Sequence, residues 1–144
     1  MSRLRINTPD EAELTMEHLY LDLERHIAAS TPGLCPVDMQ ISFLRLCHAQ
    51  SCGKCVPCRV GLGQLVRLMT DVLEHRATME TLDLIEETAR NIEVSADCAI
   101  GYDAARMVLN GLKGCRKDYI SHIRKGLCTA GITQPVPCVA LCPA

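Results

Sequence analysis

Three cysteines at every third position are the residues of this sequence best suited to chemistry. Cys52, Cys55 and Cys58 lie in segment 51–59, which reads SCGKCVPCR. Three thiolates this close together can bind one face of an iron–sulfur cluster, and a cubane cluster held by protein alone takes four thiolates. A distant cysteine should therefore complete the site. The candidate is Cys98, in the segment DCAIG at 97–101.

The ten cysteines of the chain favour metal binding over disulfide bonds. The first residues, MSRLR, lead into a polar segment and not into the apolar region of a signal peptide. We therefore expect a cytoplasmic protein, in which closely spaced cysteines are more often metal ligands or catalytic groups than disulfide partners. No apolar run approaches the roughly 20 residues that a membrane helix needs, so we expect no transmembrane segment.

Composition and charge exclude other classes of function. The chain has 144 residues, the size of one ordinary domain, and with no Trp and a single Phe its core should be mostly aliphatic. A net charge of -2 and the absence of a basic stripe disfavour nucleic acid as a partner. Acidic residues fall at spacings typical of solvent-exposed helix faces, and no glycine-flanked serine or Cys/His pair stands out. We therefore assign no catalytic residue.

Hydrophobic spacing predicts an all-α fold: a small bundle of four to five helices, with a cluster held by a loop at one end and an irregular Cys/Pro-rich C-terminal tail. Thr8-Pro9-Asp10-Glu11 indicates a first helix that continues to about Ser30. Its apolar face is expected to contain Leu14, Leu19, Leu23 and Ile27. The second and fourth helices are expected to begin after the N-caps Asp38 and Thr78, and the third at Pro57. From about Tyr102 to Arg124 we expect a fifth helix, or two consecutive helices.

Matched helix lengths connect the fourth cysteine to the first three. The helices expected after Pro57 and Thr78 have roughly 16 residues each and rise about 24 Å. The short connection at 75–77 should make them antiparallel neighbours. The end of the second helix then returns to the start of the first, and Cys98 faces the triplet.

Three regions are expected along the chain. Residues 1–34 form an amphipathic helix and a linker, 35–127 a helical-bundle [4Fe-4S] domain, and 128–144 a tail rich in cysteine and proline. The tail suggests a second cluster at Cys128, Cys138 and Cys142. That site is one ligand short unless Cys35, Cys115 or a partner joins it. The alternatives are a tail whose cysteines bind nothing and the start of a truncated domain.

Residues 37–128 closely resemble the C-terminal iron–sulfur domain of the NADH-binding, flavin-carrying subunit of respiratory complex I, a domain shared with NAD-dependent and electron-bifurcating hydrogenases. The resemblance rests on SCGKCVPCR at 51–59, CAIG at 98–101 and YISHI at 119–123. It implies that Cys52, Cys55, Cys58 and Cys98 bind one [4Fe-4S] cluster, which receives electrons from a flavin. The tail is similar to the cysteine-rich N-terminal region of the glutamate synthase small subunit family.

The large flavin- and NADH-binding region of that family has no counterpart in this sequence. Gly61-Leu62-Gly63 lacks the preceding strand and the third spaced glycine of a dinucleotide loop. We therefore expect a non-catalytic electron-transfer subunit with flavin- and iron–sulfur-containing oxidoreductase partners. The assembly would be a multisubunit NAD(P)-dependent oxidoreductase such as a hydrogenase or formate dehydrogenase complex, with electron bifurcation as one option. The chain would be either a separate subunit or a fragment of a longer polypeptide.

A zinc-stabilised protein-interaction module is the alternative, because four cysteines also suit tetrahedral Zn²⁺. Structural zinc sites typically pair two short Cys-x₂₋₄-Cys segments, so three cysteines in one loop and one remote cysteine favour iron–sulfur. Among the other residues, Cys47 is expected to pack in the core and His48 to be structural. Lys54 and Arg59 either raise the reduction potential of the cluster or are solvated surface charges.

Overall fold

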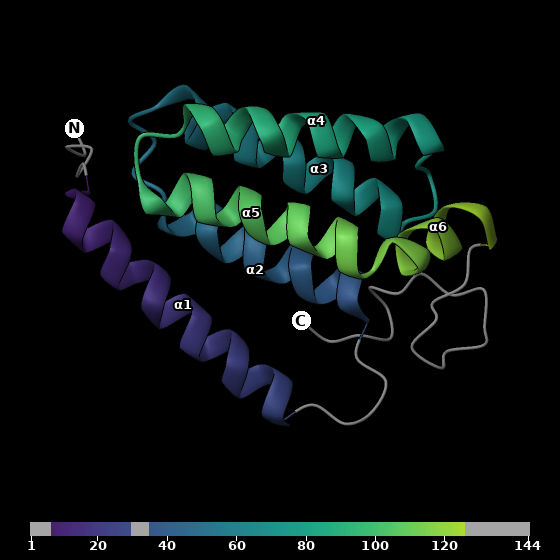
Figure 1. Ribbon diagram of the computed structural model, residues 1–144, viewed down its shortest axis with the longest axis horizontal. Coiled ribbons are helices and arrows are strands. Elements are labelled where there is room, and N and C mark those ends of the chain that lie inside the picture. Colours follow the sequence, from purple (N-terminus) through teal and green to yellow (C-terminus); the bar gives the residue numbers. More distant parts are fainter. Residues whose placement is uncertain (1–6, 30–34, 126–144) are drawn as a thin grey trace.

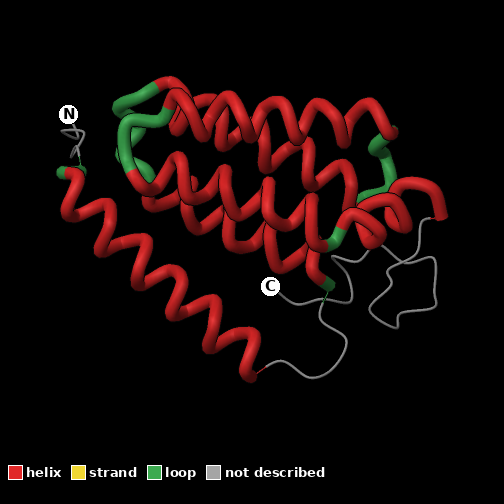
Figure 2. Tube along the Cα trace, viewed as in Figure 1, coloured by secondary structure: helices red, strands yellow, loops and turns green. Residues whose placement is uncertain are grey.

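A computed structural model describes residues 7–29 and 35–125, and within these ranges it contains only helices and the loops that connect them (Figures 1 and 2). This confirms the all-α fold: five helices form a bundle, and the N-terminal helix lies against it. No helix in the described ranges has the length and apolar character needed to cross a membrane. The elements are α1 (Pro9–Ala29), α2 (Pro36–Gln50), the π-helical turn η1 (Pro57–Gly61), α3 (Leu62–Leu73), α4 (Met79–Ser95), α5 (Ala99–Gly114) and α6 (Arg116–Lys125).

Capping side chains fix the starts of α1 and α4 where the sequence predicts them. The backbone N–H of Glu11 donates to Thr8 Oγ1 at 3.3 Å, and the backbone N–H of Thr8 donates to Glu11 Oε2 at 3.0 Å. Thr78 and Thr81 form the same reciprocal pair before α4. Each pair satisfies two backbone N–H groups that a helix start otherwise leaves without partners.

The second helix begins earlier than the sequence predicts, so the assignment of Asp38 as its N-cap is wrong. Cys35 is the N-cap and Pro36 is the first helical residue. The fixed φ of proline suits that position, and its missing N–H costs nothing there. Asp38 instead lies in the first turn with 5% of its surface exposed, and burial, reinforced by the nearby Cys35, raises its pKa.

The antiparallel helices α3 and α4 supply much of the core. Their buried side chains repeat at helical spacing and face each other and the neighbouring helices. At one end of the pair η1 packs against α4 so closely that a Cβ at Gly61 would lie 3.0 Å from Ile92 Cγ1. The expected return of α4 to the start of the preceding helix is thus confirmed. The buried residues are Leu62, Leu65, Met69, Val72 and Leu73 on the first helix, and Leu82, Ile85, Ala89 and Ile92 on the second.

Helix α1 lies across α2 and α5 (Figure 1), and its inward face matches the expected one only in part, since Leu19 and Leu23 pack against the core. Ala12, Met16 and Leu19 are buried, whereas Leu14 and Ile27, expected on the inner face, are 56% and 48% exposed. The buried set repeats at spacings of four and three residues, which makes a narrow stripe on one side of the helix. The assignment of Leu14 and Ile27 to the buried face is therefore wrong.

A buried hydrogen bond joins α6 to α2 at the end of the bundle where α2 begins. The Tyr119 hydroxyl donates to Gln40 Oε1 at 2.5 Å, and both side chains are almost completely buried. Burial raises the pKa of Tyr119, so the phenol stays protonated as the donor. Gly111 on α5 makes room for this pair, because a Cβ there would lie 1.9 Å from Gln40 Nε2.

Substitution of Gly111 by alanine should therefore destabilise the fold. We expect Gly111→Ala to lower the free energy of unfolding by about 1–3 kcal/mol, the usual effect of overpacking, as measured by urea denaturation. Gly114→Ala is the matched control, because nothing lies within 4 Å of a Cβ at that position on the same helix. The control should be neutral or slightly stabilising, and equal effects of the two substitutions would contradict the assigned role of Gly111.

Candidate metal centre

Two loops meet at one end of the bundle, and together they place the four cysteines singled out in the sequence. The first loop joins α2 to η1, and the second joins α4 to α5 (Figures 1 and 2). Cys52 and Cys55 lie in the first loop, and Cys58 lies in η1, directly after it. Cys98 lies in the second loop as the N-cap of α5. Both helices that follow these cysteines point their N-termini toward this end.

The backbone of the first loop has a conformation that its sequence is suited to adopt. Gly53 has φ of 70°, in the left-handed region where glycine carries no steric penalty. Pro57 then starts the π-helical turn, and the backbone N–H of Arg59 donates to the Cys55 carbonyl at 3.0 Å. This turn sets Cys58 inward, with only 2% of its surface exposed. Single π-turns of this kind occur frequently at functional sites.

Cys58 lies close enough to the other three cysteines for each of them to raise the pKa of its thiol. Burial of its thiol is the main cause that raises this pKa. The hydrogen bond to Cys55 and the charges of Cys55, Cys98 and Cys52 raise it further. Four neighbouring thiolates repel one another, so positive charge placed among them stabilises the set. The structure therefore brings together all four cysteines that the sequence pairs.

Cys55 connects the two loops directly. Burial alone would raise the pKa of its thiol, but hydrogen bonds from the backbone N–H groups of Asp97 and Cys58, and from the Cys58 thiol, lower it overall. The donor at position 97 belongs to the second loop, next to Cys98. Backbone N–H groups directed at a cysteine sulfur stabilise its thiolate form, which is the form that binds metal.

An ion pair also joins the loops at the surface. Lys54 Nζ lies 3.8 Å from Asp97 Oδ2, and both side chains are more than half exposed. Because water and salt screen exposed charges, this pair should add little to stability. Because Lys54 lies in the loop of the triplet and Asp97 precedes Cys98, the two charges matter more for the electrostatic potential at the thiols.

Gly101 allows the first turn of α5 to approach the sulfur atoms. A Cβ at this position would lie 3.0 Å from Cys58 Sγ and 2.5 Å from the Ala96 Cβ. The second distance is shorter than real Cβ contacts allow, so a side chain here would force the start of α5 away from its own loop, and the tight 3.0 Å contact would displace Cys58 of the first loop as well. The packing of the four-cysteine site therefore requires glycine at position 101.

The donor set fits an iron–sulfur cluster. All four groups are thiols, and soft thiolate ligands favour iron–sulfur clusters, zinc and Cu(I). Each thiolate of a cubane binds a different iron atom, so its ligands surround the cluster without converging on one point. In the described ranges no three His, Cys, Asp or Glu side chains form a group that could hold a single metal ion.

The remaining cysteines differ from these four. Cys47 is fully buried, and burial raises its pKa to about 12, which confirms its role in packing. Cys35 is also fully buried at the opposite end of the bundle, with its Sγ 3.4 Å from His122 Nε2. The sequence does not reveal this partner, although Tyr119, three residues earlier on the same helical face, gives a weak signal of burial. Cys128, Cys138 and Cys142 lie outside the described residues.

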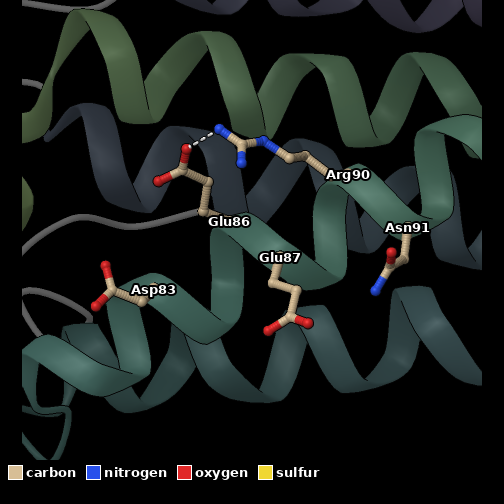
Figure 3. Close-up of a pocket in the computed structure, with 5 residues that line it drawn as sticks. All are labelled: Asp83, Glu86, Glu87, Arg90 and Asn91. Carbon is tan, nitrogen blue, oxygen red and sulfur yellow. Dashed lines mark hydrogen bonds and ion pairs between the residues drawn. The ribbon is translucent and has the colours of Figure 1, made fainter.

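A shallow depression on the surface of α4 contains no cysteine. It is lined by polar and charged side chains, and Arg90 and Glu86 form an ion pair within it (Figure 3). Such i,i+4 pairs are ordinary features of solvent-exposed helices. The full lining consists of Asp83, Glu86, Glu87, Arg90 and Asn91.

Residues 38–122 match the family described as the NADH-ubiquinone oxidoreductase-F iron–sulfur binding region. The match spans both loops and five of the helices, so the chain belongs to this family of helical iron–sulfur domains. Membership implies a [4Fe-4S] cluster as cofactor. The expected resemblance to the iron–sulfur domain of the NADH-binding subunit is thus confirmed.

Curated relatives show how the domain occurs elsewhere. An NADH-quinone oxidoreductase F-subunit, from Streptomyces coelicolor, is 40% identical over 74 residues, 51% of this chain and 16% of the relative. The NADP-reducing hydrogenase subunit HndC of Solidesulfovibrio fructosivorans is 24% identical over 76% of this chain and 22% of the relative. NADPH-Fe(3+) oxidoreductase subunit beta of Geobacter sulfurreducens is 28% identical over 86% and 20%. The chain thus spans about a fifth of the length of these relatives.

The fit at Gly101 leads to a prediction about cofactor binding. Gly101→Ala should reduce the iron and acid-labile sulfide bound per chain at least severalfold, because the added methyl group separates Cys58 from the second loop. Gly63→Ala is the control on α3, since a Cβ there meets His48 only at an ordinary 3.5 Å. Full iron and sulfide content in the Gly101 variant would show that the close packing at this glycine does not support the site.

Proposed function

We propose that Cys52, Cys55, Cys58 and Cys98 bind one [4Fe-4S] cluster and that the chain acts as a one-electron relay. The observation that carries the proposal is that two loops at one end of the bundle bring the four cysteines near one another. Family membership supports the same cofactor. When bound, the cluster accepts and releases one electron at a time.

The chain itself supplies binding, shielding and electrostatic tuning. Cys58 is buried, whereas Cys52, Cys55 and Cys98 are half-buried, so the site lies just beneath the surface. Cys98 caps α5 and Cys58 is the second residue of η1, which places two helix N-termini beside the thiols. Helix N-termini favour negative charge, as do the backbone N–H groups near Cys55. These features should stabilise the more negative, reduced form of a cluster.

Catalysis belongs, in this proposal, to other parts of an assembly. Relatives with the same domain are named as subunits of NADH-quinone oxidoreductase and of NADP-reducing hydrogenase. We infer that this chain works beside flavin- and iron–sulfur-containing subunits of a cytoplasmic NAD(P)-dependent oxidoreductase, such as an electron-bifurcating hydrogenase or a formate dehydrogenase complex. Gly61 and Gly63 lie within helical segments, which supports the proposal that the chain alone does not oxidise NADH.

A second cluster at Cys128, Cys138 and Cys142 stays a prediction. The site needs a fourth ligand, for which Cys35 and Cys115 are the candidates. Both lie at the end of the bundle opposite the first site, where the structure pairs Cys35 with His122 of α6. Cys128 follows the end of that helix by three residues in the sequence. The closeness of Cys128 to α6 in the sequence supports Cys35 and Cys115 as candidates for the fourth ligand, but it does not decide between them.

Iron, sulfide and electron paramagnetic resonance measurements on the anaerobically purified chain test the relay. We expect about four irons and four sulfides per chain, and a reduced-state signal from a [4Fe-4S] cluster, by the known chemistry of such clusters. Cys98→Ser should lose or destabilise the cluster. Cys47→Ser, at a fully buried thiol outside the site, should keep its spectrum nearly unchanged.

Other results of these measurements would change the ligand assignment, the metal or the number of clusters. An intact cluster in Cys98→Ser would refute the ligand assignment. Zinc without sulfide would favour the interaction module and overturn the relay. About eight irons per chain would establish that the tail binds a second cluster, and loss of half of them in the Cys98 variant would still identify the first site.

The ion pair between the loops predicts opposite shifts in reduction potential. Lys54→Gln should lower the midpoint potential of the cluster, because it removes a positive charge that favours the reduced state, whereas Asp97→Asn should raise it. A redox titration followed by electron paramagnetic resonance measures both shifts. Shifts in the same direction would indicate loosened packing and not charge. A buried-core substitution such as Cys47→Ser should leave the potential unchanged.

A further inference from the structure

One side chain joins α4 to α5 close to the loop that carries Cys98. Arg106 Nε on α5 donates to Glu93 Oε1 on α4 at 2.9 Å, and Arg106 Nη1 lies 3.7 Å from Asp103 Oδ1. The guanidinium also covers the ring of Tyr102, with its Cζ 5.2 Å from the ring centroid. We call the contacts of Arg106 with Glu93, Asp103 and Tyr102 the Arg106 clamp. Within the described ranges no other ion pair joins these two helices.

The Arg106 clamp has one end on each side of the Cys98 loop. Glu93 comes three residues before Ala96, the C-cap of α4. On the other side, the backbone N–H of Tyr102 donates to the Cys98 carbonyl at 3.3 Å. The Tyr102 side chain packs against the hydrophobic core, so the ring beneath the guanidinium is itself held in place. Contacts therefore run from Glu93 through Arg106 and Tyr102 to the backbone of Cys98.

The clamp adds directional contacts to an interface that is otherwise apolar. The buried side chains of α4 and α5 are mostly aliphatic, and the hydrophobic burial that holds them together has no preferred direction. A guanidinium presents its donors in a rigid planar fork, so its contacts depend on orientation. Here that fork meets Glu93 on one helix and Asp103 on the other. Because exposed ion pairs add little to stability, the clamp should matter for the orientation of α5 more than for folding.

We propose that Arg106 is a positioning residue for the cluster and acts through Cys98. By holding α5 against Glu93, it keeps the Cys98 thiol in place relative to the triplet. The inference rests on the proposed function and adds a residue outside the cysteine loops on which retention of the cluster depends. Ligands of a metal site must stay within about 0.5 Å of their productive geometry, so a small shift at the start of α5 is enough to weaken one bond. Arg106 follows Cys98 by about 12 Å along the helix, so α5 itself carries the effect.

Iron loss from the anaerobically purified, cluster-loaded chain tests this role. Bathophenanthroline, a chelator of ferrous iron, reports the rate at which iron leaves the cluster. We expect Arg106→Gln to speed this loss by about threefold to tenfold, less than the roughly 10–100-fold loss of affinity typical when a group that contacts a ligand is removed. Glu93→Gln should act in the same direction, and the double variant should be no worse than Arg106→Gln, because both substitutions remove one shared contact. The electron paramagnetic resonance signal of the reduced cluster should broaden in these variants, since Cys98 is held less uniformly.

Two matched variants separate geometry from charge. Arg106→Lys keeps the positive charge but lacks the planar fork, so it should still speed iron loss while the midpoint potential stays unchanged. Arg90→Gln removes an arginine of similar side-chain exposure, 65% against 57%, whose ion pair with Glu86 lies within α4. Its rate of iron loss and its resonance signal should match the wild type. Full recovery in Arg106→Lys would attribute the effect to charge and overturn the positioning role.

Circular dichroism of the same samples, recorded before the chelator is added, distinguishes positioning from folding. Helix content should equal that of the wild type in every variant. A lost helix signal in both Arg106→Gln and Glu93→Gln would assign the clamp to folding alone and overturn the proposal, as would equal acceleration of iron loss in Arg90→Gln. A wild-type chain without a cluster would refute the relay and this inference together. A loaded wild type, with wild-type rates and signals in the Arg106 and Glu93 variants, would refute only the inference.

Discussion

The structure depends on the antiparallel packing of two helical segments of matched length. The first, η1 with α3, runs from Pro57 to Leu73, and the second, α4, runs from Met79 to Ser95. Their shared apolar interface removes water from a continuous row of aliphatic side chains, which is the main source of stability in such a bundle. Because the segments match, the chain returns to the level at which it started. Cys98 reaches the triplet for this reason, and a shift of one turn, about 5.4 Å, would separate it from the other three cysteines.

The sequence predicted what depends on local chemistry and on periodicity. The caps at Thr8 and Thr78, the helix start at Pro57 and the return of Cys98 follow from residue types and spacing alone. The start of α2 was not predicted correctly, because Asp38 and Pro36 are both acceptable near a helix start and only packing decides between them. The inner face of α1 was also wrong in part, since leucines outnumber the small Ala12 and the flexible Met16 that fill the groove against α2 and α5.

The candidate site was predictable as a set of neighbouring cysteines but not as an environment. Cysteine spacing identifies the thiols, whereas the backbone donor at Asp97, the π-helical turn and the tight fit at Gly101 arise from tertiary structure. The two ends of the bundle also have different side-chain environments. At one end thiols lie close to solvent, and at the other the buried pairs Tyr119–Gln40 and Cys35–His122 fix α6 to the bundle. These hydrogen bonds offset part of the cost of burying the polar side chains, although His122 Nδ1 has no hydrogen-bond partner in the described part of the chain.

Cys98 is the N-cap of α5, yet its side chain makes no capping hydrogen bond. The first turn of this helix therefore has N–H groups that no side chain at the cap satisfies, although a helix N-terminus favours nearby negative charge. If Cys98 binds the cluster as we propose, its thiolate would supply that charge. Helix formation and cofactor loading would then be thermodynamically linked: free energy released on binding would also stabilise α5, and a well-formed α5 would in turn strengthen binding. The same residue would connect the maturation of the protein to its folding.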